Sequence, residues 1–226
     1  MRAIHIINKL TIANHQLSAK GANGRLQPVH LRQGDMDGAC AIYSLMMAMI
    51  TCGIINRKDA EGVYKRIDGR SSLGRLLKKL TVYNDQDKVA TDGLVRNGLF
   101  LDHVDDVITH NCKRIMTSVY SDDINNITGI ISHLKNNDPV IIGTTYRGNK
   151  GGHALLAIGY ETENDIVSEL FCLDPSYPLS ECSYWNAIIH INSNTGREYT
   201  HYYVPSNVEI KIDETICIYK KNSKTK

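Results

Sequence analysis

The strongest constraint on the fold is an apolar run, ACAIYSLMMAMITC, which extends from Ala39 to Cys52 and is followed by Gly53. The run is too long for an ordinary strand, and its apolar residues do not alternate with polar ones. It therefore predicts a helix that is apolar nearly all round and ends at Gly53. Other parts of the chain must cover such a helix on every side, so the fold has to be built around it.

Helical spacing of apolar residues recurs before residue 138. The clearest case is a set of leucines, Leu73, Leu76, Leu77 and Leu80, which share one face of a helix. The helices predicted in this half, besides 39–52, are 57–67, 72–80, 91–99 and one that follows the capping residue Ser121. Residues 1–32 indicate a strand or two with a turn at 21–24, residues 102–111 are ambiguous, and residues 114–120 indicate a strand.

After Asp138 and Pro139 the pattern changes to short strand-like runs separated by turn residues. These runs are 140–145, 154–160, 167–173, 186–191, 198–204, 208–212 and 215–219. A helix-rich half followed by a strand-rich half favours an α+β fold over alternating βαβ units. We expect one domain over residues 1–226, with a helical lobe at roughly 33–138 and an antiparallel sheet lobe at roughly 139–219.

The charges are nearly balanced, with 26 Lys and Arg against 24 Asp and Glu. This balance excludes a dedicated nucleic-acid binder. No apolar run approaches the ~18 residues of a membrane span, and no signal peptide is recognised, so a cytoplasmic protein or one secreted by a leaderless route is expected. The six cysteines show no paired spacing of the zinc type, which predicts free thiols and no metal.

Cys40 stands at the first turn of the predicted apolar helix, two residues after Gly38. A thiol acts as a nucleophile only as the thiolate, and the N-terminal end of a helix lowers a thiol's pKa. The position therefore indicates a reactive cysteine. A buried cysteine with a packing role remains the alternative, since small buried thiols are common.

His153 is the histidine best placed to be a partner for Cys40. It follows two glycines and begins an apolar strand, and Asp174 follows the next strand, 174 − 153 = 21 residues on. If the polar turn at 161–165 joins these two strands as an antiparallel pair, Asp174 lies near His153 and can fix the tautomer of its ring. Gln33, on a loop before Cys40, has the amide needed to donate to an oxyanion.

Three motifs carry a resemblance to a known family. They are Gln-Gly and Gly-x-Cys before the apolar helix (33–40), GHALLAIGY (152–160) and LDP (173–175). In this order they resemble the papain-like cysteine peptidase superfamily, and most closely its C39-like branch of bacteriocin-leader peptidases. Gln33 precedes Cys40 by 40 − 33 = 7 residues, one more than is usual in that superfamily.

The resemblance implies a papain-like fold with Cys40 as nucleophile, His153 as general base and acid, Asp174 as the residue that orients His153, and Gln33 as oxyanion donor. It implies hydrolysis of a protein or peptide substrate through a thioester, without a cofactor. The same machinery also supports a glutamine deamidase or transglutaminase, which an effector acting on host or rival proteins would use. A catalytically inactive interaction domain remains open as well. The sequence leaves the oligomeric state undetermined.

Overall fold

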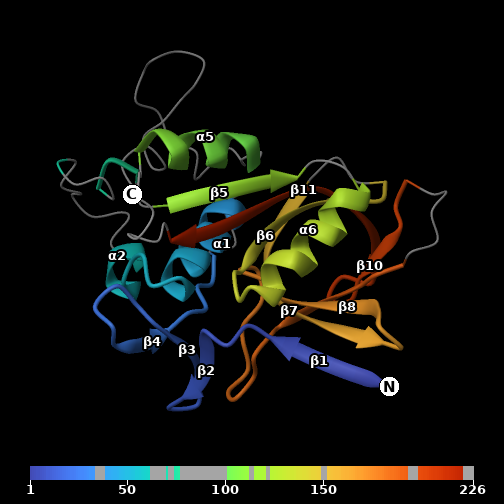
Figure 1. Ribbon diagram of the computed structural model, residues 1–226, viewed down its shortest axis with the longest axis horizontal. Coiled ribbons are helices and arrows are strands. Elements are labelled where there is room, and N and C mark those ends of the chain that lie inside the picture. The colour runs from blue at the N-terminus through green and yellow to red at the C-terminus, as the bar shows by residue number, and fades with distance from the viewer. Residues whose placement is uncertain are drawn as a thin grey trace.

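A computed structural model describes residues 1–33, 39–61, 70, 74–76, 101–111, 115–120, 123–148, 152–192 and 198–220 (Figure 1). In chain order, its elements are β1 (Arg2–Ile6), β2 (Leu10–Ala13), β3 (Gln16–Lys20), β4 (Leu26–Pro28), α1 (Cys40–Thr51), α2 (Arg57–Glu61), α5 (Leu101–Asn111), β5 (Ile115–Tyr120), α6 (Asp123–Lys135), β6 (Val140–Tyr146), β7 (Gly152–Glu163), β8 (Ile166–Leu173), β9 (Ala187–His190), β10 (His201–Tyr203) and β11 (Val208–Lys220).

Six antiparallel strands form a closed barrel in the order β7, β6, β11, β10, β9 and β8, with β8 pairing back to β7. Strand β1 extends the barrel wall along β7, and β5 extends it along β11. Strands β2, β3 and β4 form a separate three-stranded sheet. In Figure 1 this small sheet lies with α1 and α2 on one side of the barrel.

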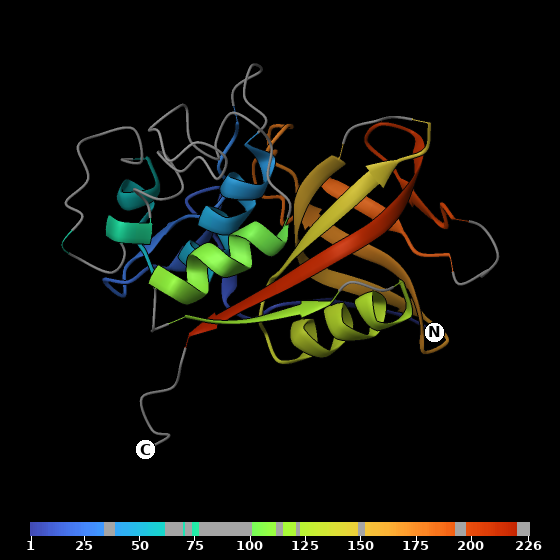
Figure 2. The ribbon, with the colours of Figure 1, turned by 90° about the horizontal axis from the view of Figure 1, so that it is seen from above.

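The predicted α+β, papain-like fold with a helical lobe and a sheet lobe is wrong. Strand β1 comes from the N-terminus and β5 from the half assigned to helices, yet both pair with strands of the barrel. Helices α5 and α6 pack against that barrel, α5 on β5 and β11 and α6 on β11, β7 and β6 (Figure 2). The helices therefore cover a mostly β structure instead of forming a body of their own. The prediction of a single domain over 1–226 stays a prediction.

Helix α1 confirms the prediction drawn from the apolar run. All of its residues from Ala41 to Thr51 except Tyr43 are buried, and it packs against β7, β6 and β3. It ends at Thr51 with Cys52 as its C-cap residue, and Gly53 follows with a φ of 64°. The Gly53 N–H donates to Ile50 O at 3.0 Å and the Ile54 N–H donates to Met49 O at 2.9 Å, the pattern of a Schellman motif.

Strands β7 and β8 form the antiparallel pair expected from the polar turn at 161–165. The turn is made by Asn164 and Asp165, which have φ values of 51° and 66°, as a tight hairpin requires. Leu156 lies opposite Leu173 in the register. His153 at the start of β7 and Asp174 just after β8 are therefore at the same end of the hairpin.

Other segments differ from the prediction in detail. The N-terminal region contains four strands instead of one or two, although the turn at 21–24 is confirmed by a bond from the Gly24 N–H to Gly21 O at 2.9 Å. The two predicted strands at 208–212 and 215–219 are one strand, β11, with an irregular register between Ile212 and Glu214. The predicted helices at 72–80 and 91–99, and the end of that at 57–67, fall mainly outside the described residues. Within these residues, no helix is both long and apolar enough to span a bilayer.

Candidate active site

Cys40 is the first residue of α1, after the N-cap residue Ala39. The N–H groups of the first turn of a helix have no partners within the helix. Within the described part of the chain, no side chain caps this helix end either. The Ala154 N–H donates to Cys40 Sγ at 3.3 Å. Burial alone would raise the pKa of this thiol, but hydrogen bonds from His153, Ala154 and Ala41 and the charge of His153 lower the pKa overall.

His153 is the side chain that connects the thiol to a carboxylate. Its Nε2 lies 2.9 Å from Asp174 Oδ1, and its ring is coupled electrostatically to the Cys40 thiol. Burial would lower the pKa of the ring, but the bonds and charges of Asp174 and Cys40 raise it to about 9. At neutral pH His153 is therefore protonated and faces a thiol whose pKa is depressed. Cys40, His153 and Asp174 are called the triad below.

Asp174 is fully buried and receives three hydrogen bonds. Besides His153, the Ser176 N–H donates to Oδ1 at 2.7 Å, and the Tyr203 hydroxyl donates to Oδ2. Burial would raise the pKa of the carboxyl group, but these donors and the charge of His153 lower it. The carboxylate is thus kept ionised in a position from which water is excluded.

Asn186 holds the backbone of Asp174 from both sides. Its Oδ1 accepts the Asp174 N–H at 2.7 Å, and its Nδ2 donates to Asp174 O at 2.8 Å and to Tyr177 O at 2.9 Å. One amide side chain therefore fixes the turn that follows β8. Because the backbone of Asp174 cannot shift, its carboxylate stays aligned with His153.

Sequence reasoning missed Asn186, Tyr203 and Tyr146. The ring of Tyr146 stacks near that of His153 with centroids 6.4 Å apart, and the ring of Tyr203 is at the same distance but tilted. None of the three belongs to a motif, and Tyr203 lies 29 residues from its partner Asp174. Only the order of β8, β9 and β10 in the barrel, which brings Tyr203 back toward β8, would have pointed to it.

Gln33 is placed next to the Asp174 turn. Its N–H donates to Pro175 O at 2.9 Å, and its Nε2 donates to Ser176 Oγ at 3.1 Å. Its buried Oε1 has no hydrogen-bond partner among the residues that the structure describes. Residues 34–38, which connect Gln33 to Cys40, lie outside the described residues. Gln33 is thus attached to the carboxylate end of the triad.

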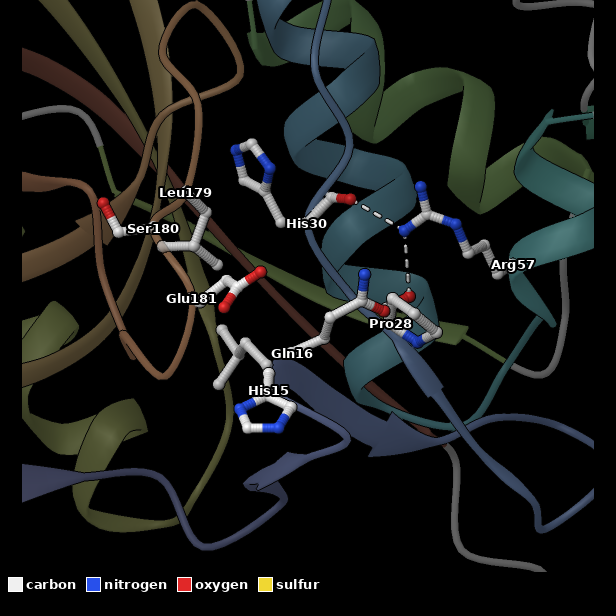
Figure 3. A pocket seen from close by; sticks show the side chains of 9 residues that line it. His15, Gln16, Pro28, His30, Arg57, Leu179, Ser180 and Glu181 are labelled. Carbon is white, nitrogen blue, oxygen red and sulfur yellow. Dashed lines mark hydrogen bonds between the residues drawn. The ribbon is translucent and has the colours of Figure 1, made fainter.

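A hollow of about 340 Å³ lies between the β2–β3 turn and the loop after β8 (Figure 3). It is lined by His30 and Arg57 among others, and by no triad residue. Arg57 donates to the backbone oxygens of Pro28 and His30, at 3.2 and 2.7 Å. Nε2 of His30 lies 3.1 Å from Asp174 O, so this side chain supports the Asp174 turn from the side of the hollow. Burial lowers the pKa of His30 and favours its neutral form.

The side chains that could hold a metal ion are not those of the triad. In the part of the chain that the structure describes, His133, Asp138 and Cys217 form the one set of such residues whose ligand atoms lie within 4.8 Å of one another. What the triad offers is a thiolate, an acid and base, and an orienting carboxylate, which are the parts of a nucleophilic amide hydrolase.

A family model described as the Peptidase_C39 like family matches residues 25–203. The match covers most of the chain and includes Gln33, Cys40, His153 and Asp174 as well as Asn186 and Tyr203. No curated protein matches the sequence.

Proposed function

We propose that this chain, which belongs to the Peptidase_C39 like family, is a cysteine peptidase that cleaves peptide bonds through a thioester formed on Cys40. The observation that carries the proposal is the position of His153, whose Nε2 lies 2.9 Å from Asp174 Oδ1, while the N–H of the next residue, Ala154, donates to Cys40 Sγ at 3.3 Å. Family membership supports a cysteine peptidase-like function, and the geometry supports the assignment of each role.

Acylation begins from the ion pair. The Cys40 thiolate attacks the carbonyl carbon of the peptide bond, a C–S bond forms, and the carbonyl electrons move onto oxygen. His153, protonated at the nitrogen that faces Cys40, gives its proton to the leaving nitrogen as the C–N bond breaks. Asp174 holds the ring through Nε2, which leaves Nδ1 as the nitrogen that faces the thiol.

Deacylation reverses the roles. Neutral His153 takes a proton from water, and the oxygen of that water attacks the thioester carbonyl. The C–S bond breaks, the acid product leaves, and Cys40 departs as the thiolate beside protonated His153. The chain is then ready for the next substrate without any cofactor.

The oxyanion of each tetrahedral intermediate needs donors. The Cys40 N–H at the start of α1 is one, because the first N–H groups of a helix have no partner within it. The amide of Gln33 is proposed as the second. This role rests on the family resemblance, and it requires the second N–H of Nε2, because the first donates to Ser176 Oγ. Loss of one such donor costs on the order of 10²- to 10³-fold in rate.

The first test is the rate of Cys40 alkylation by iodoacetamide as a function of pH, read by peptide mass spectrometry. An ordinary thiol is only about 0.3% ionised near pH 6. We expect rapid labelling of Cys40 there in the wild-type protein and slow labelling in His153→Ala. Labelling of Cys40 at the rate of exposed Cys182 in both proteins would contradict the ion pair.

The second test is incubation of a peptide library with the wild-type protein and with Cys40→Ala, followed by mass spectrometry. New N-termini that appear only with the wild type support peptide hydrolysis. If Cys40 is reactive but the products are deamidated or cross-linked glutamines, the acyl-transfer chemistry stands and the assignment as a peptidase is overturned.

A further inference from the structure

A second set of chemically active side chains lies outside the triad. It consists of His133 on α6, Asp138 in the turn after α6 and Cys217 on β11, and it is called the His133 cluster below. One ligand atom from each residue lies within 4.8 Å of the other two. Cys217 is completely buried, whereas His133 and Asp138 are partly exposed, so the cluster can be reached from the surface.

The end of α6 fixes two members of the cluster. Asn137 adopts a left-handed conformation with a φ of 64°. Its N–H donates to Leu134 O at 2.9 Å, and the Asp138 N–H donates to His133 O at 2.9 Å. These two bonds form a Schellman motif, which turns the chain back so that Asp138 lies beside His133. The two side chains are therefore held together by backbone bonds.

The barrel brings in the third member. Cys217 on β11 lies directly opposite Val140 on β6, and Val140 is two residues after Asp138. Helix α6 packs against both of these strands. The sulfur is thus placed by the sheet register, independently of the turn that places His133 and Asp138.

The three groups are a thiol, an imidazole and a carboxylate, which are the side chains that bind Zn²⁺ in proteins. With Zn–ligand distances of about 2.0–2.3 Å, ligand atoms of a tetrahedral site lie about 3.3–3.8 Å apart. The ligand atoms of the cluster, which all lie within 4.8 Å of one another, are close to this spacing. We propose that His133, Asp138 and Cys217 bind one Zn²⁺ ion, with water in the fourth position.

Lys9 competes with the ion for Asp138. Its Nζ donates to Asp138 Oδ1 at 2.7 Å, and its side chain is 33% exposed. Zinc replaces this ammonium, which turns into the solvent that it already contacts. One proton leaves Cys217 for solvent as its sulfur binds. The thiolate and the carboxylate together balance the two charges of the ion.

The protonation states of Cys217 and His133 fit the replacement of Lys9 by zinc. Burial raises the pKa of the Cys217 thiol and lowers the pKa of His133, so without metal the thiol is protonated and the imidazole is neutral. A neutral imidazole is the form that binds zinc. The nearby Cys52 is not included among the ligands, because its thiol donates to Ile218 O at 3.3 Å.

The test is direct zinc binding in a Cys40→Ala protein, which lacks the thiol of the triad. The chelator-treated protein is dialysed against ZnCl₂, its metal content is measured by mass spectrometry, and its affinity is measured by competition with a chromogenic chelator. Co²⁺ is used in parallel, because a charge-transfer absorption band appears only when a thiolate binds the ion. We expect one Zn²⁺ per chain and a cobalt–thiolate band.

Further substitutions in the Cys40→Ala protein test which residues bind the ion. Cys217→Ser and the nearly isosteric Asp138→Asn should each weaken zinc binding by at least about 10- to 100-fold, and Cys217→Ser should abolish the cobalt band. Cys182→Ser is the matched control, because it removes an exposed thiol near His15 and should change neither. Lys9→Ala should tighten binding by roughly 2- to 5-fold, the energy of an ion pair of this exposure.

Three outcomes would overturn the proposal. They are a protein that retains no zinc, a folded Asp138→Asn protein that binds zinc as tightly as its parent, and a cobalt band that survives Cys217→Ser. Circular dichroism of each variant establishes that it is folded. If Cys217→Ser does not fold, Asp138→Asn decides the test.

Discussion

The same three side-chain types, a cysteine, a histidine and an aspartate, meet at two places in this protein. In the triad, Cys40, His153 and Asp174 come from the start of α1 and from one end of the β7–β8 hairpin. In the His133 cluster, the residues come from the end of α6, the turn after it and the C-terminal part of β11. The two sets have equal composition but opposite acid–base character.

The surroundings of each set cause the difference. In the triad, the carboxylate of Asp174 is directed at His153, and the thiol of Cys40 accepts the Ala154 N–H. The pKa of the thiol is therefore lowered, and the pKa of the imidazole is raised. In the cluster the carboxylate is paired with Lys9. Burial then dominates, and it raises the pKa of the Cys217 thiol and lowers the pKa of His133. Hydrogen-bond donors and the partner of the carboxylate, more than residue identity, therefore decide whether such a set is a nucleophile.

The largest expected effect separates the two thiols. Cys40→Ser should reduce kcat/KM for peptide cleavage by on the order of 10⁴-fold or more, because it removes the thiolate. Cys217→Ser should leave kcat/KM near the wild-type value and instead lower the free energy of unfolding by about 1–3 kcal/mol, because it buries a hydroxyl group. Steady-state kinetics and urea denaturation of both variants measure this. An equal loss of activity in Cys40→Ser and Cys217→Ser would contradict the assignment of Cys40 alone as the nucleophile.

The next effect separates the two carboxylates. Asp174→Asn should lower kcat by on the order of 10²- to 10⁴-fold, because the ring of His153 loses its charged partner. The alkaline limb of the activity profile should move down from about pH 9, since Asp174 raises the pKa of His153. Asp138→Asn is the control, and its pH–activity profile should overlay that of the wild type.

A smaller effect is expected at Tyr203, whose hydroxyl donates to Asp174 Oδ2. Tyr203→Phe removes a hydrogen bond to a charged group, worth about 1.5–3 kcal/mol, and keeps the ring. We expect kcat to fall roughly 10-fold with little change in KM, and the acid limb of the pH profile to move up as the pKa of Asp174 rises. Tyr177→Phe, which removes an exposed hydroxyl that contacts Ser206, should have no effect on either. A pH profile that is unchanged in Tyr203→Phe would reduce Tyr203 to a packing role.

The smallest effect compares the two histidines by stability. The pKa of His153 is raised to about 9 in the folded state, so the stability it contributes is complete below its unfolded pKa of about 6.5 and is lost as the pH rises through 9. The pKa of His133 is lowered, so its contribution is present above about pH 6.5 and is lost as the pH falls through the folded-state value. The free energies of unfolding of His153→Gln and His133→Gln are measured by urea denaturation from below pH 6.5 to above pH 9. Their differences from the wild-type value should change with pH in opposite directions. If both differences changed with pH in the same direction, the pKa shift assigned to one of the two histidines would have the wrong sign.

Local patterns predicted much of the secondary structure. The apolar run gave α1 with its end at Gly53, and the polar turn after the His153 strand gave the β7–β8 pair, because each depends on neighbouring residues. Closure of the barrel was missed. It depends on which strand edges meet, such as β11 with β6, and no short stretch of sequence records that pairing.

The resemblance to the C39-like branch is confirmed by the family match. Its motifs brought Cys40, His153 and Asp174 to attention because each lies in a distinctive local sequence. Asn186 and Tyr203 have no such context, and their importance appears only when the fold brings them to Asp174. The His133 cluster was missed for the same reason, since its members are joined by a helix end and a sheet register.

The β7–β8 hairpin also has a practical use in protein engineering. His153 is near one end of β7, and the Asn164–Asp165 turn at the other end is about 35 Å away along an extended strand. The ammonium of Met1 bonds Asn164 Oδ1 at 2.6 Å, so the first residue lies at this same remote turn. A purification tag at the first residue, or a fluorescent reporter inserted at the turn, would therefore emerge well away from the triad and leave substrates free to reach Cys40.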